Sequence, residues 1–385
     1  MNEDLYLIAA VRTPIGRFGG GLASLTAAQL GTASARATLE RSGIDPSAVD
    51  EVIFGNARQA GVGPNVARQV AIRSGLRHEV PAYTVNQACG SGLRAIINAA
   101  DQIRLGQASI VLAGGTESMS NTPYLLTRAR WGKRMGHDEV VDGMYRDGFI
   151  CPLADEMMGA TAETLADRYG ITRDEQDAYA METQRRAGVA YAEDRFRDEI
   201  VPLEGVEKDE HPRFDTDLGS LARLPPVFRK NGTVHAGNSS GVTDGASSML
   251  VASGDAVERH GLRPMARIVG YAQAGVDPKV MGIGPVPATR KLLERSGVRL
   301  EDIDLIELNE AFAAQVLACD RELGLDRGKL NVHGGAIALG HPIGATGARI
   351  TTTLLHAMQT REKRLGLATL CISGGMGLSL LVERA

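Results

Sequence analysis

The chain has 385 residues, 43% of them hydrophobic and 23% charged, which is typical of a globular protein with more than one domain. Its net charge of −4 argues against a basic nucleic-acid-binding face, and the sequence has no apolar stretch of about 18 residues that would predict a membrane span. The first residues, MNEDLYLIAAV, lack the pattern of a targeting leader.

Apolar runs alternate with helical patterns along the first third of the chain. Strands are expected at 6–11, 51–55, 82–86 and 109–115, and helices at 25–42, 65–75 and 90–106. Gly43 marks the end of the first helix, because glycine readily adopts the conformation that ends helices. This βαβαβαβ order predicts an α/β fold with a mostly parallel sheet covered by helices on both faces.

Between residues 120 and 240 the sequence changes character and loses strong strand patterns. Two helices are expected there, over MMGATAETLADRYG and TRDEQDAYAMETQRRAGVAYAEDRF, the second of them capped by Thr172. We interpret this stretch as an inserted loop domain. The alternation then returns, with strands at 248–253 and 304–308, helices near 287–296, from Glu310 and from Gly347, and a final hairpin in ATLCISGGMGLSLLVE.

A faint internal repeat relates the two ends of the chain. The first copy is CGSGLRAIINAADQIRLGQASIVLAGGTESMS, and the second is IGATGARITTTLLHAMQTREKRLGLATLCISGGMGLS. Each copy runs from a glycine-rich turn through a helix and a charged turn into a strand that ends in a Gly-Gly pair. The repeat predicts two similar halves packed against each other.

Cys89 stands between an expected strand and an expected helix, in VNQACGSGLRAI. The free N–H groups and the positive dipole end of a helix favour thiolate over thiol, so we expect a lowered pKa for Cys89. Gly90 and Gly92 are expected to leave room for a substrate near the backbone. From this segment alone, a nucleophile and a buried small apolar residue are about equally favoured.

His341 lies in the glycine-rich segment NVHGGAIALGHPIGATGAR, directly before Pro342. A histidine on such a turn can reach a thiol across a domain interface and act as its base. Taken alone, a histidine in a surface loop is the commoner case. The run GHPIGATG also resembles a phosphate-binding loop only weakly, because it lacks the GK[ST] ending.

The other candidate residues are three cysteines and one asparagine. Cys371 ends an expected strand before a Gly-Gly pair, where a second thiol can move a proton on and off carbon, although a core cysteine is commoner. Asn309 follows the strand DLIEL and fits either a helix N-cap or a holder of active-site water. Cys151 and Cys319 lack glycine-rich surroundings, and Cys319 in particular is expected in the core. The absence of any CxxC pair argues against a zinc site or a thioredoxin-like motif. Four cysteines in so long a chain predict reduced thiols and a cytoplasmic location.

Together these segments resemble the thiolase family nearly from end to end. The matching motifs, in the family's order, are RTPIGRFGGGLA, VNQACGSGLRAI, GGTESMS, MGATAETLADRYGITRDEQD, GTVHAGNSSGVTDGA, NEAFAAQ, NVHGGAIALGHPIGATGAR and CISGGMG. The resemblance implies an α/β, thiolase-like fold of two five-stranded βαβαβαββ halves. These halves form a five-layered α-β-α-β-α core with an inserted loop domain.

The resemblance also implies the division of the chain. Residues 1–118 and 244–268 would form the N-terminal half, residues 119–243 a loop domain that binds coenzyme A, and residues 269–385 the C-terminal half. Members of the family form dimers or tetramers, so a homodimer or homotetramer is expected.

The activity that the resemblance implies is CoA-dependent acyl transfer, either thiolytic cleavage of a 3-ketoacyl-CoA or the reverse Claisen condensation to acetoacetyl-CoA. Cys89 resembles the acyl-carrying nucleophile and His341 the residue that activates it. Cys371 resembles the acid/base of the α-carbon, and Asn309 the residue that holds a water at an oxyanion hole. The backbone N–H groups of Cys89 and Ser373 would form a second oxyanion hole. No metal or redox cofactor is expected, since CoA is a substrate.

The positions that match the family's CoA- and substrate-binding residues are Met158, Phe228, Ala236, Gly237, Ser240, Met281 and Phe312. Two residues depart from the family pattern. Ser373 stands where the family often has glycine, so its hydroxyl is expected to crowd the pocket. Met157 stands where short-chain thiolases usually have histidine, which leaves longer 3-ketoacyl chains open as substrates.

Two other functions fit part of the sequence. A 3-ketoacyl-acyl carrier protein synthase pairs its cysteine with two histidines, or with a histidine and an asparagine, so Cys371 favours a thiolase. A non-catalytic thiolase-like lipid- or CoA-binding protein tends to lack one of the catalytic residues, and all four are present here.

Overall fold

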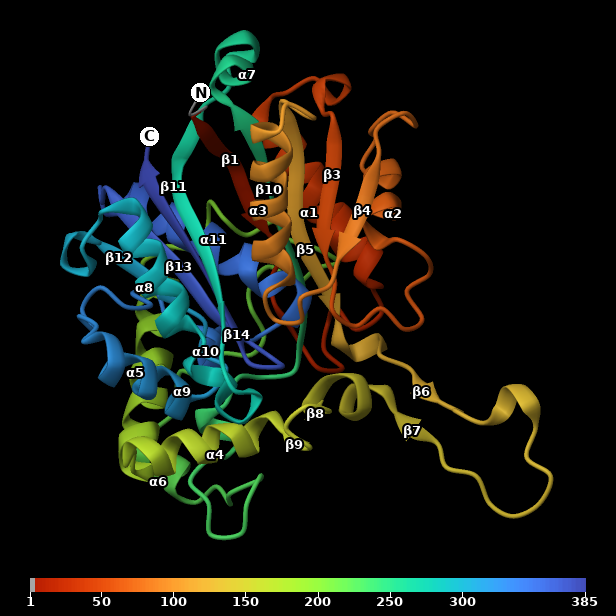
Figure 1. Cartoon of the computed structure of the whole chain (residues 1–385), viewed down its shortest axis with the longest axis vertical. Coiled ribbons are helices and arrows are strands. Elements are labelled where there is room, and N and C mark those ends of the chain that lie inside the picture. The colour runs from red at the N-terminus through yellow and green to blue at the C-terminus, as the bar shows by residue number, and fades with distance from the viewer. Residues whose placement is uncertain (1–3) are drawn as a thin grey trace.

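A mixed ten-stranded sheet runs through the computed structural model, which describes residues 4–385 (Figure 1). Its strands follow one another in the order β12 (Leu305–Leu308), β13 (Leu365–Ile372), β14 (Met376–Arg384), β11 (Pro264–Gly275), β1 (Leu5–Arg12), β10 (Thr243–Ser253), β5 (Ile110–Ser118), β3 (Glu51–Gly55) and β4 (Ala82–Val85). The short strand β2 (Gly16–Arg17) pairs with β10.

The sheet has two parts of similar design. Strands β4, β3 and β5 are parallel in the first part, as β12 and β13 are in the second, and each set is completed by antiparallel strands. Antiparallel pairing of β1 with β11 joins the two parts at residues 6–8. The expectation of two five-stranded halves is corrected for the second half. There the fifth strand is reduced to an isolated bridge between Ile306 and Leu330.

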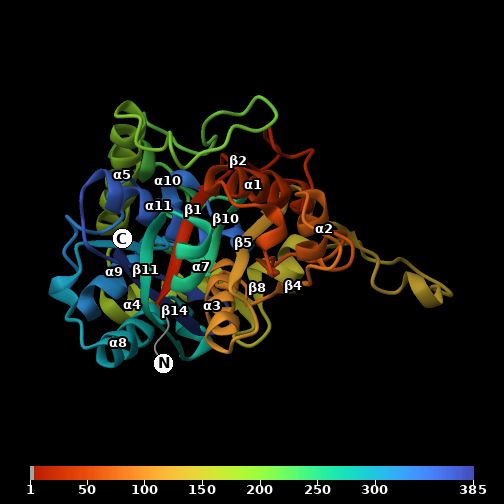
Figure 2. The same ribbon diagram turned by 90° about the horizontal axis from the view of Figure 1, so that it is seen from above.

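Helices form the remaining three layers of the core. Buried side chains of α3 (Ser91–Arg104) and α11 (Ile343–Thr360) meet strands of both sheet parts in one central cluster. The helices α1 (Ala27–Ser42) and α2 (Val66–Arg73) cover the first part, and α8 (Pro285–Ser296) and α9 (Ala313–Leu323) cover the second. Figure 2 shows these two outer pairs on opposite sides. The expected α-β-α-β-α layering is confirmed.

The two central helices cross at glycines. A Cβ atom on Gly92 would lie 2.8 Å from the backbone nitrogen of Ala348, and one on Gly347 would lie 2.3 Å from that of Leu93. Any side chain there would push α3 and α11 apart, so the glycines set the distance between the halves. This close packing also corrects one prediction. Gly92 makes room for α11 rather than for a substrate.

Residues 119–243 carry helices and short strands outside the main sheet. These are α4 (Met158–Tyr169), α5 (Arg173–Ala192), α6 (Leu218–Ala222), β6 (Tyr124–Leu125), β7 (Val141–Asp142), β8 (Ile150–Cys151) and β9 (Glu156–Met157); α7 (Gly254–His260) and α10 (Ala336–Leu339) lie elsewhere in the chain. The segment between β6 and β7 projects from the body as an arm in both views (Figures 1 and 2). The predicted domain boundaries stay predictions, and β11 runs without a break across position 268/269.

Arg12 anchors this inserted segment to the sheet. At the end of β1 its fully buried guanidinium donates from Nε to Glu199 at 2.6 Å and from Nη1 to Asp209 at 2.6 Å. Breaking a buried ion pair leaves an uncompensated charge, which is strongly destabilising. The pairs therefore hold the chain near residues 199–209 firmly against the core.

Most expected elements are confirmed, and the exceptions have tertiary causes. The capping box of Thr172 and the left-handed Gly43 lie at the predicted helix ends. Helix α9, however, begins at Ala313 rather than Glu310, because Phe312 is extended in a bridge to Ser239. Helix α11 begins four residues before the expected Gly347, directly after Pro342.

Candidate active site

A cavity of about 640 Å³ opens where the two halves meet the inserted segment. Cys89 reaches it from the start of α3, His341 from the start of α11 and Cys371 from the end of β13. These residues are far apart in sequence, yet the crossing of the central helices brings them to one place. The cavity therefore combines two thiols and an imidazole.

A tight turn presents Cys89 to the cavity. The preceding Ala88 has a φ of +46°, which is uncommon for a residue with a side chain. The turn is held by Asn86, whose Oδ1 accepts the N–H of Ala88 at 3.0 Å. It is held also by Ser91, whose hydroxyl donates to the Ala88 carbonyl at 2.7 Å. Strained backbone of this kind persists where the surroundings fix it and is frequent at active sites.

Burial raises the pKa of the Cys89 thiol above its ordinary value. A backbone hydrogen bond from Ser373 and the positive charge of Arg58 act in the opposite direction but do not reverse the shift. The predicted lowering is therefore wrong for the protein without substrate, because removal from water outweighs the helix end. Gly90, like Gly92, makes room for protein rather than substrate, since its Cβ would lie 2.5 Å from Ile372.

The hydrogen bonds around His341 fix its tautomer. The hydroxyl of Thr346 donates to the Pro342 carbonyl at 2.9 Å, so its oxygen accepts from Nδ1 of His341 at 2.5 Å. The ring therefore carries its proton on Nδ1 and leaves Nε2 free to accept one. Burial, together with Arg349 and Arg58, lowers the pKa of His341 to about 3, so the imidazole is neutral at physiological pH.

Cys371 is completely buried where β13 enters the turn of the final hairpin. Burial raises the pKa of this thiol well above its ordinary value, and the neighbouring Cys89 raises it further. The next residues continue into Gly374 and Gly375, whose φ values of +87° and +85° make the sharp turn. A protonated thiol facing the cavity beside Cys89 is a competent proton donor to carbon.

Glu117 connects the two sides of the site. Glu117 is fully buried at the end of β5. Its carboxylate accepts hydrogen bonds from the backbone N–H groups of Ala57 at 3.1 Å and of Gly344 at 2.9 Å. Gly344 belongs to the first turn of α11, three residues after His341. Since Pro342 offers no side-chain cap, Glu117 from the first half supplies the acceptor at this helix start.

The structure brings most of the residues predicted for CoA and substrate to the cavity. The wall includes Met158, Phe228, Ala236, Ser240, Met281, Phe312, Ser373 and Met157. Gly237 is not in the wall. Its N–H donates to His235 at 3.0 Å, and its α-carbon faces Leu221 and Leu224. It shapes the loop that carries Ala236 and Ser240.

Asn309 also lies outside the cavity wall. It is buried, and both its Nδ2 and its Oδ1 lack a hydrogen-bond partner within residues 4–385. Because α9 begins at Ala313, Asn309 is not its N-cap, and the capping interpretation is wrong. A buried amide without partners is unfavourable unless a water or ligand satisfies it, which agrees with the other interpretation, a holder of water.

Known proteins match the chain over its whole length. Sequence models of the thiolase N-terminal and C-terminal domains match residues 5–255 and 262–384. The chain belongs to the thiolase family. Acetyl-CoA acetyltransferases of Pseudomonas aeruginosa and Escherichia coli K12 are each 51% identical to it, over 99% of this chain and 100% and 99% of theirs. The predicted class, an acyltransferase, is confirmed.

Solved structures of thiolases have nearly the same fold. The acetyl-CoA acetyltransferase of Bacillus anthracis superposes with a TM-score of 0.97 at 46% identity, covering 100% of this chain and 99% of that one. Human mitochondrial 3-ketoacyl-CoA thiolase, in a structure with CoA, has a TM-score of 0.97 at 43% identity, covering 100% and 98%. The predicted thiolase-like fold is confirmed.

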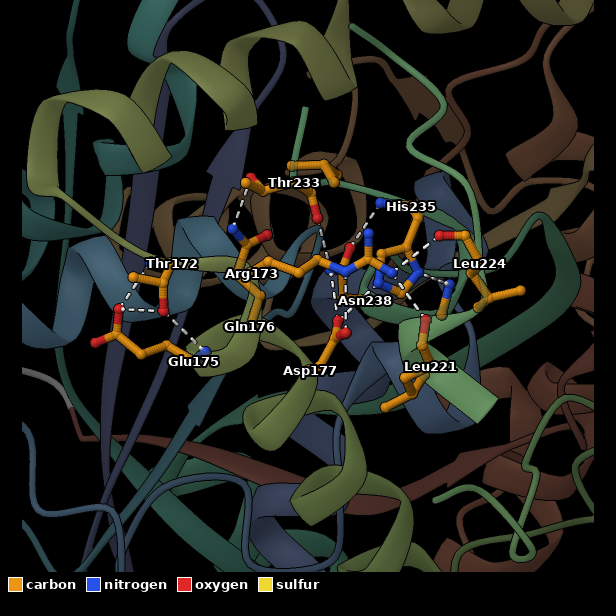
Figure 3. Close-up of polar contacts among 12 residues, drawn as sticks. Thr172, Arg173, Glu175, Gln176, Asp177, Leu221, Leu224, Thr233, His235 and Asn238 are labelled. Atoms are coloured by element: carbon orange, nitrogen blue, oxygen red, sulfur yellow. Dashed lines mark hydrogen bonds and ion pairs between the residues drawn. The ribbon is translucent and has the colours of Figure 1, made fainter. Parts of the chain in front are cut away.

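In this thiolase a polar cluster on α5 orders the loop at residues 233–240 (Figure 3). Oδ1 of Asp177 accepts Nε2 of His235 at 2.7 Å and Nδ2 of Asn238 at 3.1 Å, while Oδ2 accepts Nε of Arg173 at 3.0 Å. Burial opposes ionisation of Asp177, but the hydrogen bonds from His235 and Arg173 outweigh it and lower its pKa. Asp177 thus stays ionised and fixes the backbone beside Ala236.

Replacing Asp177 by asparagine is expected to weaken CoA binding. The loop would lose its ionised acceptor, so the KM for CoA should rise about ten-fold while kcat changes little. Steady-state thiolysis at varied CoA concentration measures both constants. The matched control is Asp174→Asn, because Asp174 lies on the same helix and is exposed. An equal rise in KM for both variants would contradict the role of Asp177.

Among its four cysteines, this thiolase is expected to react first with iodoacetamide at Cys89. Cys89 is partly exposed, whereas Cys151, Cys319 and Cys371 are buried. Since the pKa of Cys89 is raised, its labelling rate should keep increasing as the pH rises past the ordinary thiol range. Peptide mapping after short labelling checks both expectations. Earlier labelling of Cys319 would be the contrary result.

Three residues of the site were not predicted from the sequence: Arg58, Glu117 and Thr346. Thr346 and Glu117 lie inside quoted motifs, but residue type alone does not show which hydrogen bond a threonine or glutamate forms. Arg58 follows a strand in a polar stretch, where a charged side chain is normally taken for a surface residue. It is buried because residues 145–149 help to cover it, with Asp147 and Gly148 against its guanidinium.

Proposed function

We propose that this thiolase cleaves 3-ketoacyl-CoA to acetyl-CoA and a shortened acyl-CoA, and also catalyses the reverse Claisen condensation. The observation that carries the proposal is the meeting of Cys89, His341 and Cys371 at one cavity between the halves. This chemistry requires a nucleophile, a base and a group that donates a proton to carbon.

The first step forms the acyl-enzyme. Nε2 of His341 takes the Cys89 proton, and the thiolate sulfur attacks the 3-keto carbon of the substrate. The bond between C2 and C3 then breaks, and its electron pair stays on C2 of the departing acetyl-CoA. The Cys371 thiol gives its proton to C2, which leaves an acyl thioester on Cys89. Before substrate binds, the Cys89 thiol and the His341 imidazole are both neutral, because the pKa of Cys89 is raised and that of His341 is lowered. The proton therefore moves from Cys89 to His341 only as the sulfur attacks the electrophilic 3-keto carbon.

The second step releases the acyl group. Before this step the proton on Nε2 of His341 passes to the Cys371 thiolate, so that both groups are neutral again. The CoA thiol then attacks the thioester carbonyl and gives its proton to Nε2 of His341, and the departing Cys89 thiolate takes that proton back. We propose that the backbone N–H groups of Cys89 and Ser373 stabilise one oxyanion, and that His341 with a water on Asn309 stabilises the other. Each donor of this kind is worth roughly 3 kcal/mol in the rate.

Coenzyme A is proposed to lie across the inserted segment. Support comes from Met158, Phe228, Ala236, Ser240, Met281 and Phe312 in the cavity wall. The rings of Phe228 and Phe312 are packed edge to face with centroids 5.9 Å apart, which forms a firm apolar surface. Gly237 contributes by shaping this loop.

The acyl chain is proposed to extend beyond acetoacetyl. Met157, in place of the polar histidine of short-chain thiolases, lines the cavity. Phe149 and Ile150 add further apolar wall beside it. A cavity of about 640 Å³ is within the range that holds small-molecule ligands.

The surroundings of the enzyme are proposed as follows. No metal or redox cofactor takes part, since acid–base groups and a thiol complete the reaction. A homodimer or homotetramer is supported by the projecting arm, where Trp131 and Met135 are 91% and 84% exposed. A cytoplasmic location is supported by four free cysteines. No helix within residues 4–385 is both long and apolar enough to cross a bilayer.

A panel of 3-ketoacyl-CoAs of increasing chain length tests the proposal. Thiolysis with ping-pong kinetics and release of acetyl-CoA is expected, with activity continuing beyond acetoacetyl-CoA. If no 3-ketoacyl-CoA of the panel is cleaved, the proposed reaction is overturned, and the non-catalytic alternative is supported instead. Decarboxylation of a malonyl thioester would support the synthase alternative, which the full-length relatives named acetyl-CoA acetyltransferase do not favour.

A further inference from the structure

Arg58 is a buried charge in the cavity wall that the proposed reaction does not use. It follows β3, is 7% exposed and shares the cavity with Cys89 and His341. Burial raises the pKa of Cys89 and lowers that of His341; the positive charge of Arg58 opposes the first shift and adds to the second, as expected of a guanidinium near the reacting end of the cavity. A buried charge of this kind is strongly unfavourable unless something pairs with it.

One edge of the guanidinium is not used by the protein. Nη1 donates to the carbonyl of Asp147 at 3.1 Å, whereas Nε is buried without a partner and Nη2 forms no hydrogen bond within residues 4–385. The backbone of Gly148 lies against this group, since a Cβ there would be 2.4 Å from Nη2. The Nε–Nη2 edge is the fork that binds a carboxylate through two parallel hydrogen bonds.

The nearest buried carboxylate cannot fill this fork. No carboxylate oxygen within residues 4–385 forms an ion pair with the guanidinium of Arg58, although the backbone N–H of Arg58 donates to Oε1 of Glu117 at 3.1 Å. Burial raises the pKa of Glu117, and the nearby charge of Arg58 opposes that rise. Both oxygens of Glu117 already accept hydrogen bonds from backbone N–H groups, among them those of Ala57 and Gly344. The positive charge is therefore left for a ligand.

Arg58 also stands apart from the residues proposed for CoA. Those residues come from α4, the loops around 228–240 and 281, and the start of α9. Arg58 comes from the loop after β3 and is covered by residues 145–149. Of the substrate's two parts, the acyl chain attached to Cys89 is the one that remains for Arg58.

Resting on the proposed function, we propose that Arg58 binds an anionic group at the end of the acyl chain. The substrate class is then a 3-ketoacyl-CoA whose acyl part ends in a carboxylate. This carboxylate would pair with Nε and Nη2 of Arg58 while Cys89 attacks the 3-keto carbon. Charge pairing in a site removed from water gives strong selectivity over an uncharged chain of the same length.

The test compares two 3-ketoacyl-CoAs of equal length, one ending in a carboxylate and one in a methyl group. For the unmodified enzyme, thiolysis kcat/KM should be at least about ten-fold higher for the carboxylate. In Arg58→Met, which keeps the length and removes the charge, this ratio should fall by at least about a hundred-fold. Arg58→Lys, which keeps the charge without the fork, should lie between them.

Arg146→Met is the control, because Arg146 lines the same cavity but is exposed beside Asp147. Its ratio should stay within about three-fold of the unmodified enzyme. An unchanged ratio in Arg58→Met would overturn the inference and show that Arg58 acts on Cys89 for all substrates alike. Preference of the unmodified enzyme for the methyl chain would overturn it without any variant. Failure of the proposed function looks different, since neither substrate nor acetoacetyl-CoA would then be cleaved.

Discussion

Cys89→Ala is expected to abolish acyl transfer, with kcat reduced by a factor on the order of 10⁴ or more. Without the sulfur no covalent acyl-enzyme forms, and the neutral His341 cannot move the acyl group by itself. Mass spectrometry of the protein after incubation with acetyl-CoA measures the acyl-enzyme directly. The unmodified protein should gain one acetyl group on the peptide that contains Cys89, and the variant should gain none.

The matched control is Cys319→Ala. Cys319 is completely buried on α9, away from the cavity wall, where its thiol donates to the Gly282 carbonyl at 3.3 Å. Loss of this contact should cost about 1 kcal/mol of stability and leave acetylation intact. Acetylation that persists in Cys89→Ala, or disappears in Cys319→Ala, would show that the acyl group is carried elsewhere.

Cys371→Ser is expected to separate the two halves of the reaction. Carbon–carbon cleavage should fall by about 10² to 10⁴-fold, because a serine hydroxyl is a much weaker acid than the thiol it replaces. Acetyl transfer from acetyl-CoA to Cys89 needs no proton on carbon and should change by less than about three-fold. Thiolysis of acetoacetyl-CoA measures the first rate, and isotope exchange between CoA and acetyl-CoA measures the second.

The contrast with Cys89→Ala makes this result specific. The nucleophile variant should lose both half-reactions, whereas Cys371→Ser should lose one. Cys371 belongs to β13, on the side of the site that the second half of the chain forms. A structural defect caused by its replacement would slow both half-reactions together. Equal losses in thiolysis and exchange would therefore show that Cys371 is not the proton donor to carbon.

Secondary structure was largely predictable because local patterns and tertiary packing agree. The alternation of apolar strands with helices predicted the elements of the first sheet part in their order along the chain, and Gly43 and Thr172 mark helix ends through their own backbone chemistry. The predicted mostly parallel sheet was wrong, because β1, β10 and β5 pair antiparallel, as do β11, β14 and β13. The prediction failed at the start of α9, since pairing between Phe312 and Ser239 holds the chain extended. No local pattern could show a bridge between residues so far apart.

The electrostatic predictions depended on burial, which a sequence does not contain. A helix start beside Cys89 predicted a lowered pKa, but removal of the thiol from water raises it. The same limit applies to Gly92, which was assigned to substrate access and instead allows α3 to approach α11. For Gly92 the neighbour that decides the outcome, Ala348 on α11, comes from the other half of the chain.

From the sequence alone the α/β class, the repeat of two halves and the family could be predicted, and Cys89, His341 and Cys371 could be singled out as candidate site residues, because each lies in a motif whose order along the chain is informative. The tertiary structure decided how these residues act. It set the neutral state and tautomer of His341 through burial and Thr346, and it left Nε of the buried Arg58 guanidinium without a hydrogen-bond partner within residues 4–385. Solvent exclusion and long-range contacts produce these properties, and they exist only once the two halves have packed together.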